Sequence, residues 1–152
     1  MSYQSVGIRF LALALDTLIL MIPLFVLGFV MGSTSGEASG AGFALEGGAA
    51  FLYFLLAFAL WLGYYTYLEG SSGATIGKRI LGLQVVNLDG SKIDMRQALI
   101  RNLLRIVDGL FTYLVGAILV WTSPTRQRLG DRVAGTIVVR KSTVTAPEIA
   151  QV

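Results

Sequence analysis

The sequence contains neither cysteine nor histidine among its 152 residues. Without cysteine, the chain cannot form disulfides, thiolate metal sites or cysteine nucleophiles. Without histidine, it lacks the commonest metal ligand and the side chain that most often carries protons near neutral pH. Any proton chemistry must therefore use Asp, Glu, Lys or Tyr, and we expect neither a bound metal nor a cofactor.

Charged residues are also scarce. They make up 14% of the chain, whereas hydrophobic residues make up 55%. A soluble protein is about 25% charged and roughly 45–50% apolar. Together with a mean hydropathy of +0.71, this composition predicts an integral membrane protein. The net charge of +3 then bears on topology and lipid contact, and we expect no nucleic-acid partner.

Two long apolar segments occupy residues 10–31 and 49–68. A helix over the first would measure ~33 Å, which exceeds the ~30 Å of a hydrocarbon core. A signal peptide fits this segment poorly, because the apolar run is long and contains an aspartate. We therefore predict two transmembrane helices at these positions.

The charges around these helices predict their orientation. The Gly- and Ser-rich loop over residues 32–48 contains no Lys or Arg. The basic residues after the second helix are Lys78, Arg79, Lys92, Arg96, Arg101 and Arg105. Basic loops stay in the cytoplasm, so we expect a multi-pass protein with a cytoplasmic amino terminus. Four aromatic residues at the end of the second helix fit an interfacial belt: Trp61, Tyr64, Tyr65 and Tyr67.

Two later segments have the composition of short strands. "ILGLQVVNLDGSKI" combines β-branched residues with a tight turn at Asp89–Gly90. "GTIVVRK" is similar and could pair with "LGLQVV" if both lie on one face of the membrane. The preceding "GATIGKR" is not a phosphate-binding loop, because three residues rather than four separate its glycines. A tight turn that feeds the strand explains it better.

Residues 94–107 are predicted to form an amphipathic helix. Asp94 and Gln97 have the spacing of a capping box at its start. Apolar residues recur at helical spacing on one side, and the opposite stripe is polar: Arg101, Arg105, Asp108 and Thr112.

Residues 106–121 are apolar but number only 16. A full crossing would place the basic residues that follow outside the cell, against the charge rule. A helical hairpin or re-entrant segment avoids this conflict, and a short third crossing stays open. The predicted fold is therefore all-α and integral to the membrane. It comprises two transmembrane helices, this hairpin or third segment, and a small cytoplasmic β-hairpin-like element. Residues 1–141 form one domain, and residues 142–152 are expected to be a disordered tail.

Four stretches in this order carry a resemblance to a known family: "IRFLALALD", "GATIGKRILGLQVVNLDG", "RNLLRIVD" and "RLGDRVAGTIVVRK". They resemble the RDD family of prokaryotic membrane proteins, which is named for one arginine and two aspartates. Arg9 matches the arginine and Asp16 the intramembrane aspartate. Asp131 best matches the second aspartate, with Asp108 as the other candidate. The resemblance implies a prokaryotic inner-membrane protein. It suggests transport, including cation/proton antiport in some members.

Arg9 lies directly before the first predicted helix, and Asp16 lies inside it. They are seven residues apart, which places them on one face at ~10.5 Å and excludes a direct salt bridge. Arg9 can extend to the headgroups. An ionised Asp16 would cost ~2.5–3.5 kcal/mol near mid-helix, so we expect it to be protonated, hydrated or paired with a cation. Arg101 and Arg105 are the expected partners. A structural ion pair and an exchangeable carboxylate both remain open interpretations.

The remaining acidic candidates have simpler explanations as well. Asp131 lies between Arg128 and Arg132, which allows a helix cap or a surface ion pair. Asp108 follows Arg105 by three residues, which allows a local pair on one helix.

These features lead to a functional prediction. We expect a homo-oligomer of the inner membrane that moves a small solute or monovalent cation, and cation/proton antiport is one form that this transport could take. The alternative is a non-catalytic scaffold or accessory subunit that presents a basic cytoplasmic face. We expect no enzymatic activity, because the sequence contains no nucleophile–base pair, metal cluster or nucleotide fingerprint.

Overall fold

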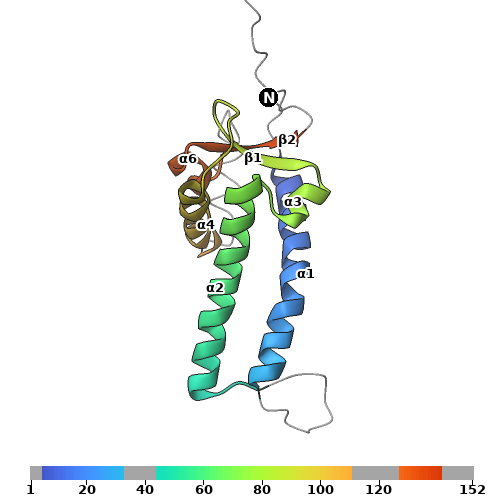
Figure 1. Cartoon of the computed structure of the whole chain (residues 1–152), viewed down its shortest axis with the longest axis vertical. Helices are drawn as coiled ribbons and strands as arrows, with labels where there is room; N and C mark the ends of the chain where they lie inside the picture. The colour runs from blue at the N-terminus through green and yellow to red at the C-terminus, as the bar shows by residue number, and fades with distance from the viewer. Residues whose placement is uncertain (1–4, 33–43, 111–126, 142–152) are drawn as a thin grey trace, which may run out of the picture.

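The computed structural model describes residues 5–32, 44–110 and 127–141, with the backbone only for residues 107–110. Two long helices, α1 (Val6–Met31) and α2 (Gly47–Ser72), run side by side through most of the molecule (Figure 1). Each has 26 residues and is long and apolar enough to cross a membrane. Both predicted spans lie within these helices, which extend further chiefly at the end where α1 begins and α2 ends, called the polar end.

The middle and lower parts of these helices expose large apolar side chains. Val30 is 76% exposed and Phe51 is 73% exposed. Monomeric soluble proteins rarely expose contiguous apolar patches larger than a few hundred Å². This surface is therefore suited to a lipid environment.

The other described elements gather at one end of the helix pair (Figure 1). They are α3 (Ile76–Ile80), β1 (Leu83–Asn87), α4 (Met95–Leu110), α6 (Leu129–Val133) and β2 (Thr136–Arg140). Strands β1 and β2 pair antiparallel, from Leu83 with Arg140 to Asn87 with Thr136. The predicted pairing of the two strand-like segments is confirmed, and both lie at the end where α1 begins.

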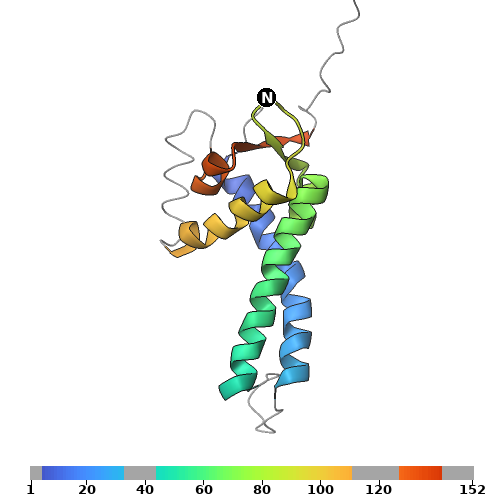
Figure 2. The same ribbon diagram turned by 60° about the vertical axis from the view of Figure 1, so that its left-hand side comes forward.

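Helix α4 begins with the predicted capping box. The Asp94 amide donates to Gln97 Oε1 at 3.0 Å, and the Gln97 amide donates to Asp94 Oδ1 at 2.7 Å. The helix lies across the upper part of α2 (Figure 2). Its polar face, with Arg101 and Arg105, is buried, whereas its apolar face is exposed at Leu99, Leu103 and Ile106. This arrangement is the reverse of a helix on a soluble protein.

Glycines allow the short helices α3 and α6 to approach α1 and α4 closely. A Cβ on Gly77 of α3 would lie 2.4 Å from the Ala12 carbonyl oxygen of α1. A Cβ on Gly130 of α6 would lie 2.7 Å from the Arg101 carbonyl oxygen of α4. The "GATIGKR" segment is thus more than a turn. It ends α2 at Gly73, which has a left-handed φ of 75°, and begins α3 at the N-cap Thr75.

The strands complete a small apolar core beside α1 and α4. Ala12, Leu83, Val85, Ile93, Ala98 and Val138 form one buried cluster. The predicted amphipathic helix at 94–107 is confirmed and continues to Leu110. Residues 111–121 of the predicted hairpin or third segment, and the tail at 142–152, lie outside the described residues.

Candidate functional site: a buried charge cluster

Five charged side chains form a continuous ion-pair chain at the end where the small elements gather. In order they are Arg9, Asp131, Arg101, Glu69 and Lys78, from α1, α6, α4, α2 and α3 respectively. Positive and negative groups alternate along it. The side chains in these pairs are at most 6% exposed. One electrostatic network therefore joins all five described helices.

Asp131 is the carboxylate at the α1 end of the ion-pair chain. Arg9 Nη1 donates to its Oδ2 at 2.8 Å, and Arg101 Nη1 lies 2.8 Å from its Oδ1. The Arg128 amide also donates to Oδ2, at 3.2 Å, so Asp131 caps the start of α6. The helix-cap interpretation is confirmed, but the surface ion pair is wrong, because Asp131 is 2% exposed. Arg9 is buried in the same contact, so its predicted extension to the headgroups is also wrong.

Glu69 is the carboxylate at the α3 end. Its Oε2 accepts from Arg101 Nε at 3.1 Å, and its Oε1 accepts from Lys78 Nζ. Arg101 thus bridges the two carboxylates and also donates to Thr136 Oγ1 of β2. Removing one member of such a buried pair typically costs ~3–5 kcal/mol, because it leaves a charge uncompensated.

The surroundings of these groups shift their proton affinities. Burial alone would raise the pKa of Asp131, but the guanidinium groups of Arg101, Arg128 and Arg9 hold that pKa well below its ordinary value. Burial alone would lower the pKa of Arg101, but the Asp131 and Glu69 carboxylates raise it. Burial lowers the pKa of Lys78 to about 8, although Glu69 opposes this change. Asp131 and Arg101 therefore stay charged near neutral pH, and Lys78 is closer to titrating.

Asp16 forms a second, separate polar site. Its Oδ1 accepts from Tyr64 Oη and from the Gly77 amide, both at 2.7 Å, and its Oδ2 accepts from Thr75 Oγ1 at 2.6 Å. The side chain is 1% exposed. Asp16 therefore holds α1 against α2 and α3 through neutral donors. Among the described residues, none of the four ion pairs involves it.

The predicted pairing of Asp16 with Arg101 or Arg105 is wrong. Helix α4 packs on α2, so its arginines meet α2 side chains before they could reach α1. Arg101 binds Glu69, and the Arg105 guanidinium lies 4.3 Å from the centre of the Tyr65 ring, in a cation–π contact. The side chain of Asp108 lies outside the described residues.

The structure brings Arg9, Arg101 and Asp131 together and places Arg105 beside them on Tyr65. Nothing in the sequence patterns had indicated Glu69, and no pattern had linked Lys78, Thr75 or Tyr64 to a buried polar site. The available signal for Glu69 was its position. It is a carboxylate at the end of an apolar helix, nine residues before a lysine in a glycine-rich turn. Tyr64 was hidden among aromatics that fit an interfacial belt.

The fold and this site define a small helical membrane protein whose charged residues are concentrated at one end. The RDD family matches the chain over residues 3–135, and the protein belongs to this family. It is 30% identical over 145 residues to the uncharacterised protein YxaI of Bacillus subtilis (strain 168). That match covers 88% of this chain and 95% of the relative. No solved structure matches the chain.

Proposed function

We propose that the protein is a transporter that binds and releases a proton or a small monovalent cation at Asp16. The observation that carries this proposal is the difference between its carboxylates. Glu69 and Asp131 each contact two cationic side chains, whereas the described partners of Asp16 are all neutral. Among the buried carboxylates that the structure describes, Asp16 is therefore the one whose negative charge is left for an exchangeable cation to neutralise.

The surroundings of Asp16 support such an exchange. An ionised carboxylate inside a bilayer is costly, and a bound proton or cation removes that cost. The hydroxyl groups of Tyr64 and Thr75 can rotate, so they can donate to the carboxylate or turn their oxygens toward a bound cation. Both hydroxyls lie within 2.7 Å of Asp16.

Access to Asp16 requires movement, because the side chain is buried. Helix α3 covers it and lies between Gly73 and Gly82, which have left-handed φ angles of 75° and 65°. Glycine hinges at both ends suit a short element that moves as a unit. We propose that α3 opens the site toward the end of the molecule where the small elements gather.

We further propose that a homo-oligomer of multi-pass subunits encloses the rest of the path, and that no enzymatic step is involved.

Liposomes that contain the purified protein and a pH-sensitive dye test this proposal. Imposed Na⁺, K⁺ or Li⁺ gradients should move protons in the wild type, and Asp16→Asn should slow this by at least about tenfold, the range expected for loss of an essential proton carrier. Asparagine preserves the shape of the site, since its oxygen can accept from Tyr64 and Gly77 and its amide can donate to Thr75. Asp89→Asn is the control, because Asp89 lies in the exposed turn and should leave transport unchanged. Failure of all three gradients, or wild-type rates for Asp16→Asn, would exclude exchange at this residue.

The alternative function is a non-catalytic scaffold or accessory subunit. The observation that favours it is the set of exposed basic residues at the polar end, including Arg79, Lys92 and Arg96. Cross-linking in native membranes should then capture a stoichiometric partner that Arg79→Glu loses. Arg79 suits this test better than its neighbour Lys78, which is buried against Glu69. Recovery of the homo-oligomer alone would count against a scaffold.

A further inference from the structure

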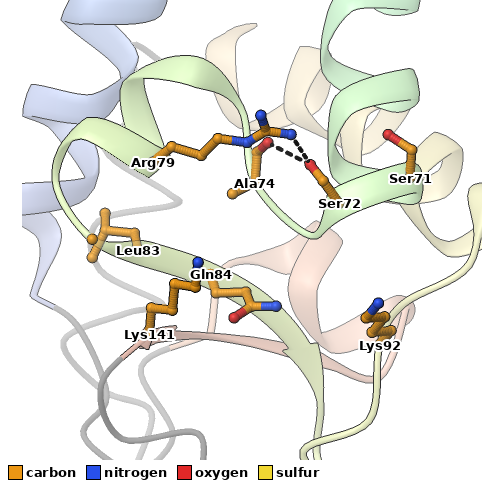
Figure 3. A pocket seen from close by; sticks show the side chains of 9 residues that line it. Ser71, Ser72, Ala74, Arg79, Leu83, Gln84, Lys92 and Lys141 are labelled. Carbon is orange, nitrogen blue, oxygen red and sulfur yellow. Dashed lines mark hydrogen bonds between the residues drawn. The ribbon is translucent and has the colours of Figure 1, made fainter.

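A cavity of about 520 Å³ lies at the polar end of the molecule, apart from both charged sites (Figure 3). Its walls come from the end of α2, from α3, from β1 and from the residues that follow the Asp89–Gly90 turn and β2. The lining residues are Ser71, Ser72, Ala74, Arg79, Gly82, Leu83, Gln84, Lys92 and Lys141.

Three cationic side chains line this cavity and no carboxylate does. Arg79, Lys92 and Lys141 are exposed, and none takes part in the ion pairs found among residues 5–32, 44–110 and 127–141. Ser72 Oγ accepts from Arg79 Nη2, which holds the guanidinium at the wall (Figure 3). The adjacent Lys78 turns inward and pairs with Glu69, so the charges of Lys78 and Arg79 serve different sites.

Exposed apolar side chains lie within one helical turn of residues that line the cavity. Tyr67 is 64% exposed and lies one turn before Ser71, whose hydroxyl donates to the Tyr67 carbonyl at 2.6 Å. Ile76 and Ile80, within one turn of Arg79, are 39% and 64% exposed. Three cations around one cavity, close to exposed apolar side chains, match a ligand that has an anionic head and apolar tails.

We propose that this cavity binds the phosphate group of an anionic membrane lipid, with its acyl chains along Tyr67 and Ile76. Arginine and lysine are the side chains that bind phosphate oxygens most effectively, and one arginine and two lysines line this cavity. The cavity lies where α2 ends, which is the level at which a spanning helix meets the headgroups. The proposal is independent of transport at Asp16, since no lining residue bonds that carboxylate.

Native mass spectrometry in an uncharged detergent tests this site. Dioleoylphosphatidylglycerol is the probe, and dioleoylglycerol, which has similar chains and no phosphate, is its control. The wild type should bind one phosphatidylglycerol at least tenfold more tightly than dioleoylglycerol. Arg79→Gln, Lys92→Gln and Lys141→Gln should each weaken that binding about fivefold, the effect expected of one basic residue at a lipid headgroup.

Arg96→Gln is the matched control variant. Arg96 is exposed on α4 and does not line the cavity, so this variant should change binding less than twofold. All substituted side chains are exposed, and unchanged thermal unfolding would show that the fold is retained. Equal weakening by Arg96→Gln would indicate general charge attraction and overturn the site, as would wild-type binding in all three cavity variants.

Inorganic phosphate is the second probe. If it binds with the same dependence on the three residues while phosphatidylglycerol does not, the lipid assignment is overturned in favour of free phosphate.

Discussion

At the scale of single residues, two aspartates of this protein have opposite environments. Asp131 lies between two arginines, whereas Asp16 accepts hydrogen bonds from two hydroxyls and one amide. The first arrangement fixes a negative charge in place by compensating it. The second satisfies the carboxylate oxygens and leaves the charge uncompensated. This difference gives Asp131 a structural role and leaves Asp16 as the residue proposed to exchange a cation.

Asp131→Asn should lower the free energy of unfolding by about 3–5 kcal/mol, because the buried guanidinium groups of Arg9 and Arg101 would lose the carboxylate that both contact. It should also change the response to acid. The folded pKa of Asp131 lies below its unfolded value of ~3.9, so its contribution is present above that pH and is lost as pH falls toward the folded pKa. The variant should therefore lose less stability than the wild type between about pH 4 and pH 2.

Thermal unfolding in detergent, followed by circular dichroism from neutral pH downward, checks both effects. Asp89→Asn in the exposed turn is the control and should stay within about 0.5 kcal/mol of the wild type. An acid profile of Asp131→Asn that parallels the wild type would contradict the assignment of this carboxylate to the ion-pair chain.

At the scale of elements, α4 shows how the environment determines which face of a helix is buried. Its polar residues pack against α2, where they meet Glu69 and Tyr65. Its apolar residues remain on the outside, which is costly in water and favourable against acyl chains. The helix is therefore suited to the membrane interface, with its apolar face toward lipid.

Spin labels at single introduced cysteines test the orientation of α4, and the natural absence of cysteine makes this direct. A label at Leu103→Cys should collide more often with oxygen, which partitions into lipid, than with a water-soluble nickel reagent. A label at Arg96→Cys should show the reverse preference, because Arg96 lies near the capped start of the helix. Matching accessibility at the two positions would rule out an interfacial α4.

Contact between α3 and α1 depends on the absence of a side chain at Gly77. Gly77→Ala would place a carbon 2.4 Å from the Ala12 carbonyl oxygen, and neither backbone can move easily. We expect a loss of about 1–3 kcal/mol in unfolding free energy, typical of overpacking. Gly63→Ala is the control. No atom lies within 4 Å of its added carbon, and alanine favours helix, so stability should stay equal or rise by up to about 1 kcal/mol. Equal melting of Gly77→Ala and the wild type would show that α3 does not pack as described.

At the scale of the whole molecule, polar and apolar parts are separated along the long axis. The strands and short helices lie at the end where α1 begins, whereas α1 ends and α2 begins at the opposite end (Figure 1). The residues of the ion-pair chain and of the basic cavity belong to the first of these ends. If both helices cross the membrane, Ser5 and Ser91 must lie on one side of it and Glu46 on the other.

Labelling of single cysteines with a membrane-impermeant maleimide tests this arrangement in cells. Glu46→Cys should react in intact cells, whereas Ser5→Cys and Ser91→Cys should react only after the membrane is opened, as the positive-inside rule predicts. Reaction of all three variants from the same side would disprove two crossings.

Local patterns in the sequence were sufficient for most of the described elements, although not for the short helices α3 and α6. Apolar length predicted α1 and α2, the capping box predicted the start of α4, and β-branched runs predicted the paired strands. Each of these signals depends on neighbours within a few residues along the chain. The family resemblance likewise indicated Arg9, Asp16 and Asp131 as the residues to examine.

Partner choice among the charges was decided only by the tertiary structure. Arg9 and Asp131 are 122 residues apart in the chain, and Arg101 could have faced Asp16, Glu69 or Asp131 on charge alone. The outcome depends on which helices approach closely, and Gly77 and Gly130 set those approaches. Opposite charges attract without regard to their distance along the sequence. The sequence by itself therefore determined that buried charges would need partners of opposite sign. Only the packing of the helices determined which partners they have.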